Sequence, residues 1–164
     1  DPHSAQGDRA MVEILRDMGA EIRWEGETLV SCASKLHGLR VDCAQVPDLV
    51  PILAVAMAAA EGESRITGAA RLRIKESDRL SAMAAALTAA GADVSELPDG
   101  LIIRGGKRLH AAKIEGCNDH RIVMAMTMAS EIADGELTIT DAEATAKSAP
   151  AFWREFEHLG GLAR

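Results

Sequence analysis

An internal repeat of roughly 70 residues constrains the fold of this chain more than any other feature of its sequence. Short segments recur in the same order along the chain. Met18-Gly19-Ala20 returns as Ala90-Gly91-Ala92, and residues 62–67 return as residues 135–140. A third copy begins near Lys147. The sequence therefore predicts repeated units rather than unrelated domains. The expected units cover residues 8–76, 77–146 and, in part, 147–164.

Hydrophobic patterning predicts the same order of elements in each unit: an amphipathic helix, two short strands around a turn, a third strand, a buried helix and a closing strand. In the first unit we expect helices over 9–18 and 48–60, and strands over 21–24, 28–31, 39–44 and 62–67. In the second unit we expect helices over 78–90 and 119 to about 133, and strands over 93–97, 101–104, 113–117 and 135–140. Pro150 is expected at the first position of a last helix. The fold class is α/β, or α+β if the sheets are largely antiparallel.

The second helix of each unit is apolar on all its faces, which is typical of a helix enclosed by other elements. The sequence therefore predicts buried central helices with the sheets outside. Both helices are expected to begin with Asp, at Asp48 and Asp119. An Asp there is a favoured N-cap. Alternatively, the carboxylate is held at the helix start to accept a proton, and the sequence leaves both interpretations open.

Composition excludes several classes of protein. A chain of 164 residues with 48% hydrophobic content can bury one substantial core. A net charge of −7, with only two Trp and two Phe, disfavours nucleic acid as a partner. The longest apolar run, residues 49–60, is too short to cross a bilayer, so no membrane is expected. The three cysteines, Cys32, Cys43 and Cys117, lack CxxC spacing, which favours a reducing cytoplasm over disulfides or zinc.

Basic residues are concentrated between Arg65 and Arg79, where five cations accompany two acids. Such a patch on an acidic chain suits a small anionic ligand. The run from Arg73 to Arg79 is expected at a strand-to-helix junction. There, free backbone N–H groups and the helix dipole add to the field of Lys75 and Arg79. Glu76, between these two cations, is a candidate for proton transfer.

Two further cations are expected near other helix starts. Arg121 opposes the dipole of the helix expected from Asp119, so a ligand or an acidic partner is predicted for it. His120, beside it, is either a hydrogen-bonded structural residue or a functional one. Lys147 corresponds by the repeat to Lys75. If the repeats pack side by side, the four cations meet at one end and bind a ligand with several negative groups; otherwise they are solvated surface charges. These cations are Lys75, Arg79, Arg121 and Lys147.

Together these motifs resemble the 5-enolpyruvylshikimate-3-phosphate (EPSP) synthase family, the enolpyruvyl transferases of the shikimate pathway. The resemblance covers nearly the whole chain. The related UDP-N-acetylglucosamine enolpyruvyl transferases share the fold but are not expected to carry the Lys-Glu-Ser-Asp-Arg run. The segments that carry it are Gln6-Gly7-Asp8, Met18-Gly19-Ala20, Val46-Pro47-Asp48, the run from Arg73 to Arg79, Asn118-Asp119-His120-Arg121 and Lys147-Ser148-Ala149-Pro150.

The resemblance implies the C-terminal part of a cytoplasmic, monomeric, two-domain enzyme built from βαβαββ units. It implies transfer of the enolpyruvyl group of phosphoenolpyruvate to the 5-hydroxyl of shikimate-3-phosphate, with release of phosphate and without a metal or organic cofactor. A missing N-terminal half would supply most contacts to shikimate-3-phosphate, so the fragment alone is expected to be inactive. The alternatives are an anion-binding module without activity and a UDP-N-acetylglucosamine enolpyruvyl transferase-like enzyme.

The resemblance also implies roles for individual residues. Asp48 would accept the proton of the 5-hydroxyl, and Glu76 would be the acid at the methylene carbon. Lys75 would contact shikimate-3-phosphate and assist proton transfer. The phosphoenolpyruvate anion would be held by Arg79, Arg121 and Lys147, with His120 also in the substrate site. Arg71 stands where some members of the family have Asn and is assigned no role.

Overall fold

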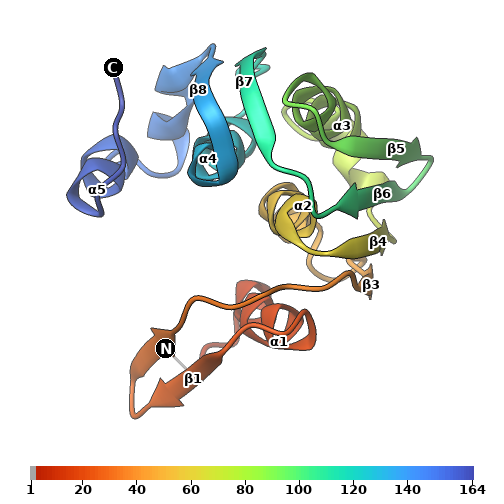
Figure 1. Cartoon of the computed structure of the whole chain (residues 1–164), viewed down its shortest axis with the longest axis vertical. Helices are drawn as coiled ribbons and strands as arrows, with labels where there is room; N and C mark the ends of the chain where they lie inside the picture. Colours follow the sequence, from red (N-terminus) through yellow and green to blue (C-terminus); the bar gives the residue numbers. More distant parts are fainter. Residues whose placement is uncertain (1–2) are drawn as a thin grey trace.

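The computed structural model describes residues 3–164. Helices α2 and α4 lie at its centre, packed against β6 and β8, and the β1–β2 hairpin lies beside α1 (Figure 1). The same order of six elements occurs twice. The first set is α1 (Ala10–Asp17), β1 (Ile22–Glu25), β2 (Thr28–Ser31), β3 (Arg40–Asp42), α2 (Val50–Ala59) and β4 (Gly62–Thr67). The second set is α3 (Arg79–Ala89), β5 (Asp93–Leu97), β6 (Gly100–Gly105), β7 (Leu109–Ile114), α4 (His120–Ala129) and β8 (Ala133–Ile139). The last helix is α5 (Phe152–His158). The exact limits of the repeat units stay a prediction.

The sheets join one set of elements to the next. The largest has the strand order β3-β4-β6-β5, with β3 and β4 parallel and the other neighbours antiparallel. It therefore combines two strands of the first set with the hairpin of the second. Strands β7 and β8 form a separate parallel pair, and β1 and β2 form an antiparallel hairpin. Mixed sheets of this kind agree with the expected α/β class.

The core lies around α2 and α4, as their apolar sequences predict. Leu53 and Met57 of α2, and Ile122 and Met126 of α4, have no solvent-exposed surface. Burying side chains of this size contributes about 1.5–3 kcal/mol each relative to exposure. This burial fixes both helices in the interior and holds their N-terminal ends close together. Within residues 3–164, no helix is long and apolar enough to cross a membrane.

Two elements end earlier than the sequence indicates. The strand expected over 113–117 is β7, Leu109–Ile114, which also begins four residues earlier than predicted. It stops at Ile114 because Gly116 donates its N–H to the Thr140 side chain and Cys117 leaves the extended conformation. The helix expected to reach residue 133 ends at Ala129, and a 3-10 turn leads from it directly into β8. Local backbone hydrogen bonding therefore sets both of these ends.

The segment before α3 also differs from expectation. It is not a direct strand-to-helix junction, because a 3-10 helix, Ala70–Ile74, lies between β4 and α3. Arg73 in this segment donates hydrogen bonds to the carbonyl oxygens of Leu97 and Pro98, at 2.6 and 2.8 Å. Hydrogen bonds to the carboxylates of Glu96 and Asp78 raise the pKa of Arg73. Arg73 thus ties the start of the charged run to the β5–β6 hairpin.

The last helix likewise begins later than predicted. Its N-cap is Ala151 and its first residue is Phe152, so Pro150 lies outside the helix and not at its first position. The prediction for Pro150 was therefore wrong by two residues. Pro at this place still restricts the chain that enters the helix.

Candidate functional site

The predicted site residues lie at the starts of helices or beside them. Asp48 belongs to a short 3-10 helix, Pro47–Leu49, that leads into α2. Lys75 and Glu76 lie between the Ala70–Ile74 turn and α3. Arg79 is the first residue of α3, His120 and Arg121 are the first two of α4, and Lys147 ends a 3-10 segment, Ala142–Lys147. The structure brings these seven residues together in two contact groups joined by residues 118–121.

Asp48 is the centre of the first group. Its Oδ1 accepts a hydrogen bond from Arg79 Nη1 at 2.9 Å and lies 3.6 Å from Lys75 Nζ. Its Oδ2 lies 3.5 Å from Arg121 Nη2, while its main-chain oxygen accepts from Arg121 Nη1 at 3.1 Å. One carboxylate therefore faces three cations, and it remains partly exposed. Asp48 is thus an acidic partner of Arg121, for which the sequence predicted either a ligand or an acidic partner.

The N-cap interpretation of Asp48 is wrong. The N-cap of α2 is Leu49, and no side chain caps this helix. Pro51 occupies the first turn and has no N–H, so one of the usual unpaired donors is absent. The Asp48 carboxylate is consequently available to the cations.

Asp119 is a helix N-cap, which is the first of the two interpretations that the sequence left open. Its carboxylate caps α4 by accepting the Arg121 N–H at 3.0 Å. It also accepts from Arg79 Nε and Nη2, at 2.8 and 3.2 Å, and from the Ser77 hydroxyl at 3.0 Å. Asp119 has no exposed surface, and the Arg79 side chain is only 3% exposed. Burial alone raises the pKa of Asp119, but the hydrogen bonds from Arg79, Arg121 and Ser77 outweigh it and hold the pKa below its ordinary value.

The sequence left Asp119 open as an N-cap or a proton acceptor and assigned it no role in the substrate site. The repeat contained the signal, because Asn118-Asp119-His120 aligns with Pro47-Asp48-Leu49. Asp48 and Asp119 now prove to be the two carboxylates that hold Arg79. Equivalent positions of the two repeat units thus carry the two carboxylates that bind Arg79.

Glu76 is the centre of the second group. Its Oε2 lies 3.1 Å from His120 Nδ1 and 3.9 Å from Lys147 Nζ. Glu76 and Lys147 are both about 40% exposed, at 39% and 41%. The Lys147 ammonium also donates to the main-chain oxygen of Asn118. This group is open to a ligand, in contrast to the buried Arg79–Asp119 pair.

A metal ion fits the site poorly. Ligand atoms of Glu76, Asp119 and His120 lie within 4.8 Å of one another, which is close enough for a shared ion. However, both Asp119 oxygens already accept hydrogen bonds from the Arg79 guanidinium. A dication would have to displace that buried cation. We therefore assign these residues no metal.

The charge of the site favours a small anion. Four cations surround three carboxylates in a region formed by the starts of α3 and α4, whose unpaired N–H groups add positive potential. Arginine and lysine at different depths can bind phosphate and carboxylate groups of one ligand. Three of these cations meet at Asp48, and the fourth, Lys147, lies beside Glu76. The sequence predicted that the cations would converge on condition that the repeats pack side by side.

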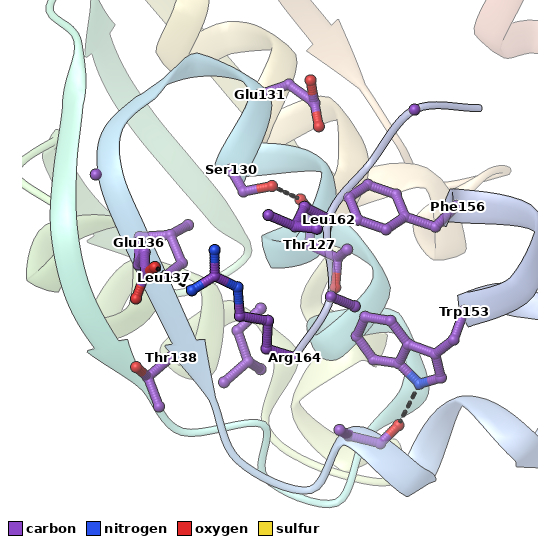
Figure 2. Close-up of a pocket in the computed structure, with 15 residues that line it drawn as sticks. Thr127, Ser130, Glu131, Glu136, Leu137, Thr138, Trp153, Phe156, Leu162 and Arg164 are labelled. Carbon is purple, nitrogen blue, oxygen red and sulfur yellow. Dashed lines mark hydrogen bonds and ion pairs between the residues drawn. The ribbon is translucent and has the colours of Figure 1, made fainter. Parts of the chain in front are cut away.

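A larger hollow lies apart from these charges (Figure 2). It has a volume of about 730 Å³ and opens between β8 and α5. Its wall includes Trp153, Phe156, Leu162 and Arg164 on one side and Leu137 of β8 on the other. None of the residues of the two contact groups lines it. The site is therefore defined by the charged groups and not by this hollow.

Known proteins share both the sequence and the architecture of this chain. The family model described as EPSP synthase (3-phosphoshikimate 1-carboxyvinyltransferase) matches residues 1–156. The 3-phosphoshikimate 1-carboxyvinyltransferase of Clostridium novyi is 46% identical over 99% of the chain. That of Halobacterium salinarum is 48% identical over 97% of the chain. The chain spans 37% of the length of each of these two relatives.

Solved structures of other proteins share the fold of this chain. EPSP synthase from Acinetobacter baumannii superposes with a TM-score of 0.83 and 35% identity over 93% of this chain and 39% of its own. The enolpyruvyl transferase NikO from Streptomyces tendae gives a TM-score of 0.78 over 96% of this chain and 38% of its own, and at 21% identity it supports the fold alone. The fold is therefore that of the enolpyruvyl transferases. Within that class, the match over residues 1–156 shows that the chain belongs to the EPSP synthase family.

Proposed function

We propose that this chain is the C-terminal part of a transferase that moves the enolpyruvyl group of phosphoenolpyruvate to the 5-hydroxyl of shikimate-3-phosphate and releases phosphate. The observation that carries the proposal is the meeting of four cations around Asp48 and Glu76 in a member of the EPSP synthase family. The remainder of the enzyme, an N-terminal half, supplies the other shikimate-3-phosphate contacts. The reaction belongs to aromatic amino acid biosynthesis, in a monomeric cytoplasmic enzyme.

In this proposal, Asp48 is the base. Its oxygens face Lys75, Arg79 and Arg121. The carboxylate and phosphate groups of phosphoenolpyruvate take over these cations, which leaves the Asp48 oxygens free to accept the proton of the 5-hydroxyl. The hydroxyl oxygen then attacks C2 of phosphoenolpyruvate. Arg79 takes part through Nη1, because its other nitrogens are held by the buried Asp119.

Glu76 is the acid that protonates the methylene carbon as the new C–O bond forms. His120 and Lys147 flank its carboxyl group and keep it directed toward the ligand. The tetrahedral intermediate then returns a proton from the same carbon to the Glu76 carboxylate and expels phosphate. Arg121 and Lys147 stabilise the charge on the departing phosphate, while Lys75 contacts shikimate-3-phosphate.

A second candidate is an anion-binding module without turnover. The observation that favours it is that the chain spans only 37% of its relatives' length. Such a module would bind phosphoenolpyruvate but would not turn it over in any combination. A preference for UDP-N-acetylglucosamine as acceptor would be a third outcome, and an assay with both acceptors separates it.

The test is complementation in trans. The chain is mixed with the N-terminal remainder of the Clostridium novyi relative, and phosphate release from phosphoenolpyruvate is measured with shikimate-3-phosphate present. We expect activity only when both parts and both substrates are present. Arg121→Ala or Lys147→Ala should lower kcat/KM by roughly 100-fold, because each removes a charged ligand contact.

The matched control is Arg108→Ala, which removes a cation whose side chain is 75% exposed and paired with Asp134. It should leave the rate unchanged. Binding of phosphoenolpyruvate without phosphate release in the complemented mixture would favour the binding module. An equal loss of kcat/KM in Arg108→Ala and Arg121→Ala would show that the overall charge of the protein, and not this site, determines the rate.

A further inference from the structure

The turn that leads into α4 has an unfavourable backbone conformation. Gly116 O accepts the Asp119 N–H at 3.0 Å, which closes a four-residue turn. The two central residues, Cys117 and Asn118, have φ angles of 54° and 49°. A turn with positive φ at both central positions belongs to the type I′ class, which favours Gly and Asn. Cys at the first of these positions costs about 1 kcal/mol, so neighbouring contacts must hold the turn.

Those contacts come from the segment that follows β8. The Asn118 N–H donates to Asp141 Oδ2 at 2.8 Å, and the Asn118 main-chain oxygen accepts from the Lys147 ammonium. The residue Asp141 precedes the Ala142–Lys147 segment and itself has a φ of 55°. The main-chain N–H and the main-chain oxygen of Asn118 are therefore bound by the two ends of a single segment.

Packing leaves the turn little freedom to shift. Gly116 donates its N–H to Thr140 Oγ1 at 3.0 Å. A Cβ atom at Gly116 would lie 2.2 Å from the Thr140 main-chain oxygen, so the two backbones are in direct contact. The turn is thus pressed against the end of β8, and its next residues are Asp119 and His120. Any movement of Asn118 would be passed to both.

We propose that Asp141 is a positioning residue for the anion site. By holding the Asn118 N–H, its carboxylate fixes the turn that places Asp119 against Arg79 and His120 against Glu76. The same turn presents the Asn118 oxygen that orients Lys147. Asp141 makes no contact with Glu76, Arg79 or Arg121 among the described interactions, so it acts through the turn. This inference deepens the proposed function and rests on it for the identity of the ligand.

The first test uses the chain alone and needs no turnover. Hydrogen exchange of the Asn118 amide and the carboxyl titration of Asp119 are followed by NMR in the parent, Asp141→Ala and Asp141→Asn. In Asp141→Ala we expect Asn118 to exchange at least roughly tenfold faster, because a hydrogen bond to a charged group is lost. The pKa of Asp119 should rise toward its ordinary value, because its contacts with Arg79 and the Arg121 amide loosen.

The Asn variant separates position from charge. Loss of the Asp141 charge by itself would lower the pKa of Asp119, so a rise in Asp141→Ala cannot come from charge. Asp141→Asn keeps an oxygen that accepts the Asn118 N–H and should retain slow exchange and a low Asp119 pKa. Asp134→Ala removes an exposed carboxylate paired with Arg108 and serves as the control without effect.

The second test measures turnover in the complemented enzyme. Asp141→Ala should raise KM for phosphoenolpyruvate roughly tenfold and leave KM for shikimate-3-phosphate little changed, with rescue by Asp141→Asn. Because Asp141→Ala also weakens folding, the double variant Asp141→Ala/Asn118→Gly is measured beside it. Glycine adopts the required φ without strain, so this variant should fold but keep the raised KM.

The outcomes distinguish the two proposals. An inactive parent mixture would overturn the proposed function, and the NMR comparison would then decide the role of Asp141. Unchanged Asn118 exchange or an unchanged Asp119 titration in Asp141→Ala overturns the positioning role. Equal increases in both KM values, or no rescue by Asp141→Asn, overturn it as well.

Discussion

At the scale of single residues, the most constrained group is the Arg79 guanidinium, which is almost completely buried and donates to two carboxylates. Arg79→Ala would leave Asp119 buried and charged without its partner. We expect a loss of about 3–5 kcal/mol in the free energy of unfolding, measured by urea denaturation.

The control for this loss is Arg104→Ala. Arg104 pairs with Glu63 and Asp93 at a surface where its side chain is 46% exposed. Exposed pairs of this kind contribute about 0–1 kcal/mol. If the two variants lost similar free energy, the buried pair would not stabilise the site as the structure indicates.

The lowered pKa of Asp119 predicts how the free energy of unfolding depends on pH. Because the folded state holds this pKa below the ordinary value of 3.8, the carboxylate contributes stability above pH 3.8. That contribution is lost as the pH falls through the lowered folded pKa. Urea unfolding measured between pH 7 and pH 2 should therefore show a steeper acid decline for the parent than for Asp119→Asn. Parallel curves for the two proteins would contradict the assignment.

Residue-level inference from the sequence succeeded where charge opposed local structure. Arg121 at a helix start predicted a ligand or an acidic partner, and the Asp48 carboxylate lies within ion-pair distance of it. It failed for the Asp48 cap, because Pro51 removes a donor that a cap would satisfy. Inference from the sequence also missed Asp141, because an Asp that follows a strand is compatible with many kinds of turn. Only coordinates show that its carboxylate accepts the amide of Asn118, 23 residues earlier.

At the scale of elements, the repeat and the hydrophobic pattern predicted every helix and strand of the two complete sets, and most boundaries lie within a few residues. The errors fall where backbone hydrogen bonding overrides hydrophobicity. Gly116 ends β7 early through Thr140, and the 3-10 turn after Ala129 ends α4. The 3-10 helix before Lys75 has no periodic signal, because it is held by Arg73 and the β5–β6 hairpin.

A close approach between α2 and β6 gives an element-scale prediction. A Cβ atom at Gly105 would lie 2.3 Å from the main-chain oxygens of Met57 and Ala60. Gly105→Ala should therefore push β6 away from the end of α2 and lower the free energy of unfolding by about 3 kcal/mol. Thermal and urea denaturation measure the change.

The same substitution at Gly7 is the control. There the nearest atom to a new Cβ is a methyl group of Val46 at 3.2 Å, and a side chain can move by a few tenths of an ångström. We expect Gly7→Ala to stay within about 1 kcal/mol of the parent. Comparable losses of the free energy of unfolding in both variants would mean that α2 and β6 move apart more easily than the short distances at Gly105 indicate.

At the scale of the whole molecule, the largest sheet pairs strands of one set of elements with strands of the next set. Strands β3 and β4 are parallel, and the free edge of β4 accepts β6 from the hairpin that follows α3. Strands β7 and β8 form the equivalent parallel pair. Within residues 3–164, no third strand pairs with β8. The hollow of Figure 2 lies along this strand, beside α5.

The last prediction follows from this geometry and the proposed function. When the N-terminal remainder of a relative restores activity, we expect its chain to add a strand to β8, because unpaired strand edges readily accept one. Amide hydrogen exchange in β8 should then slow by at least roughly tenfold, while β6, already paired on both sides, should not change. Mass spectrometry of the mixture, with and without the added part, makes the comparison. Restored activity with unchanged exchange in β8 would place the contact between the two parts elsewhere and leave the β8 edge without a role in assembly.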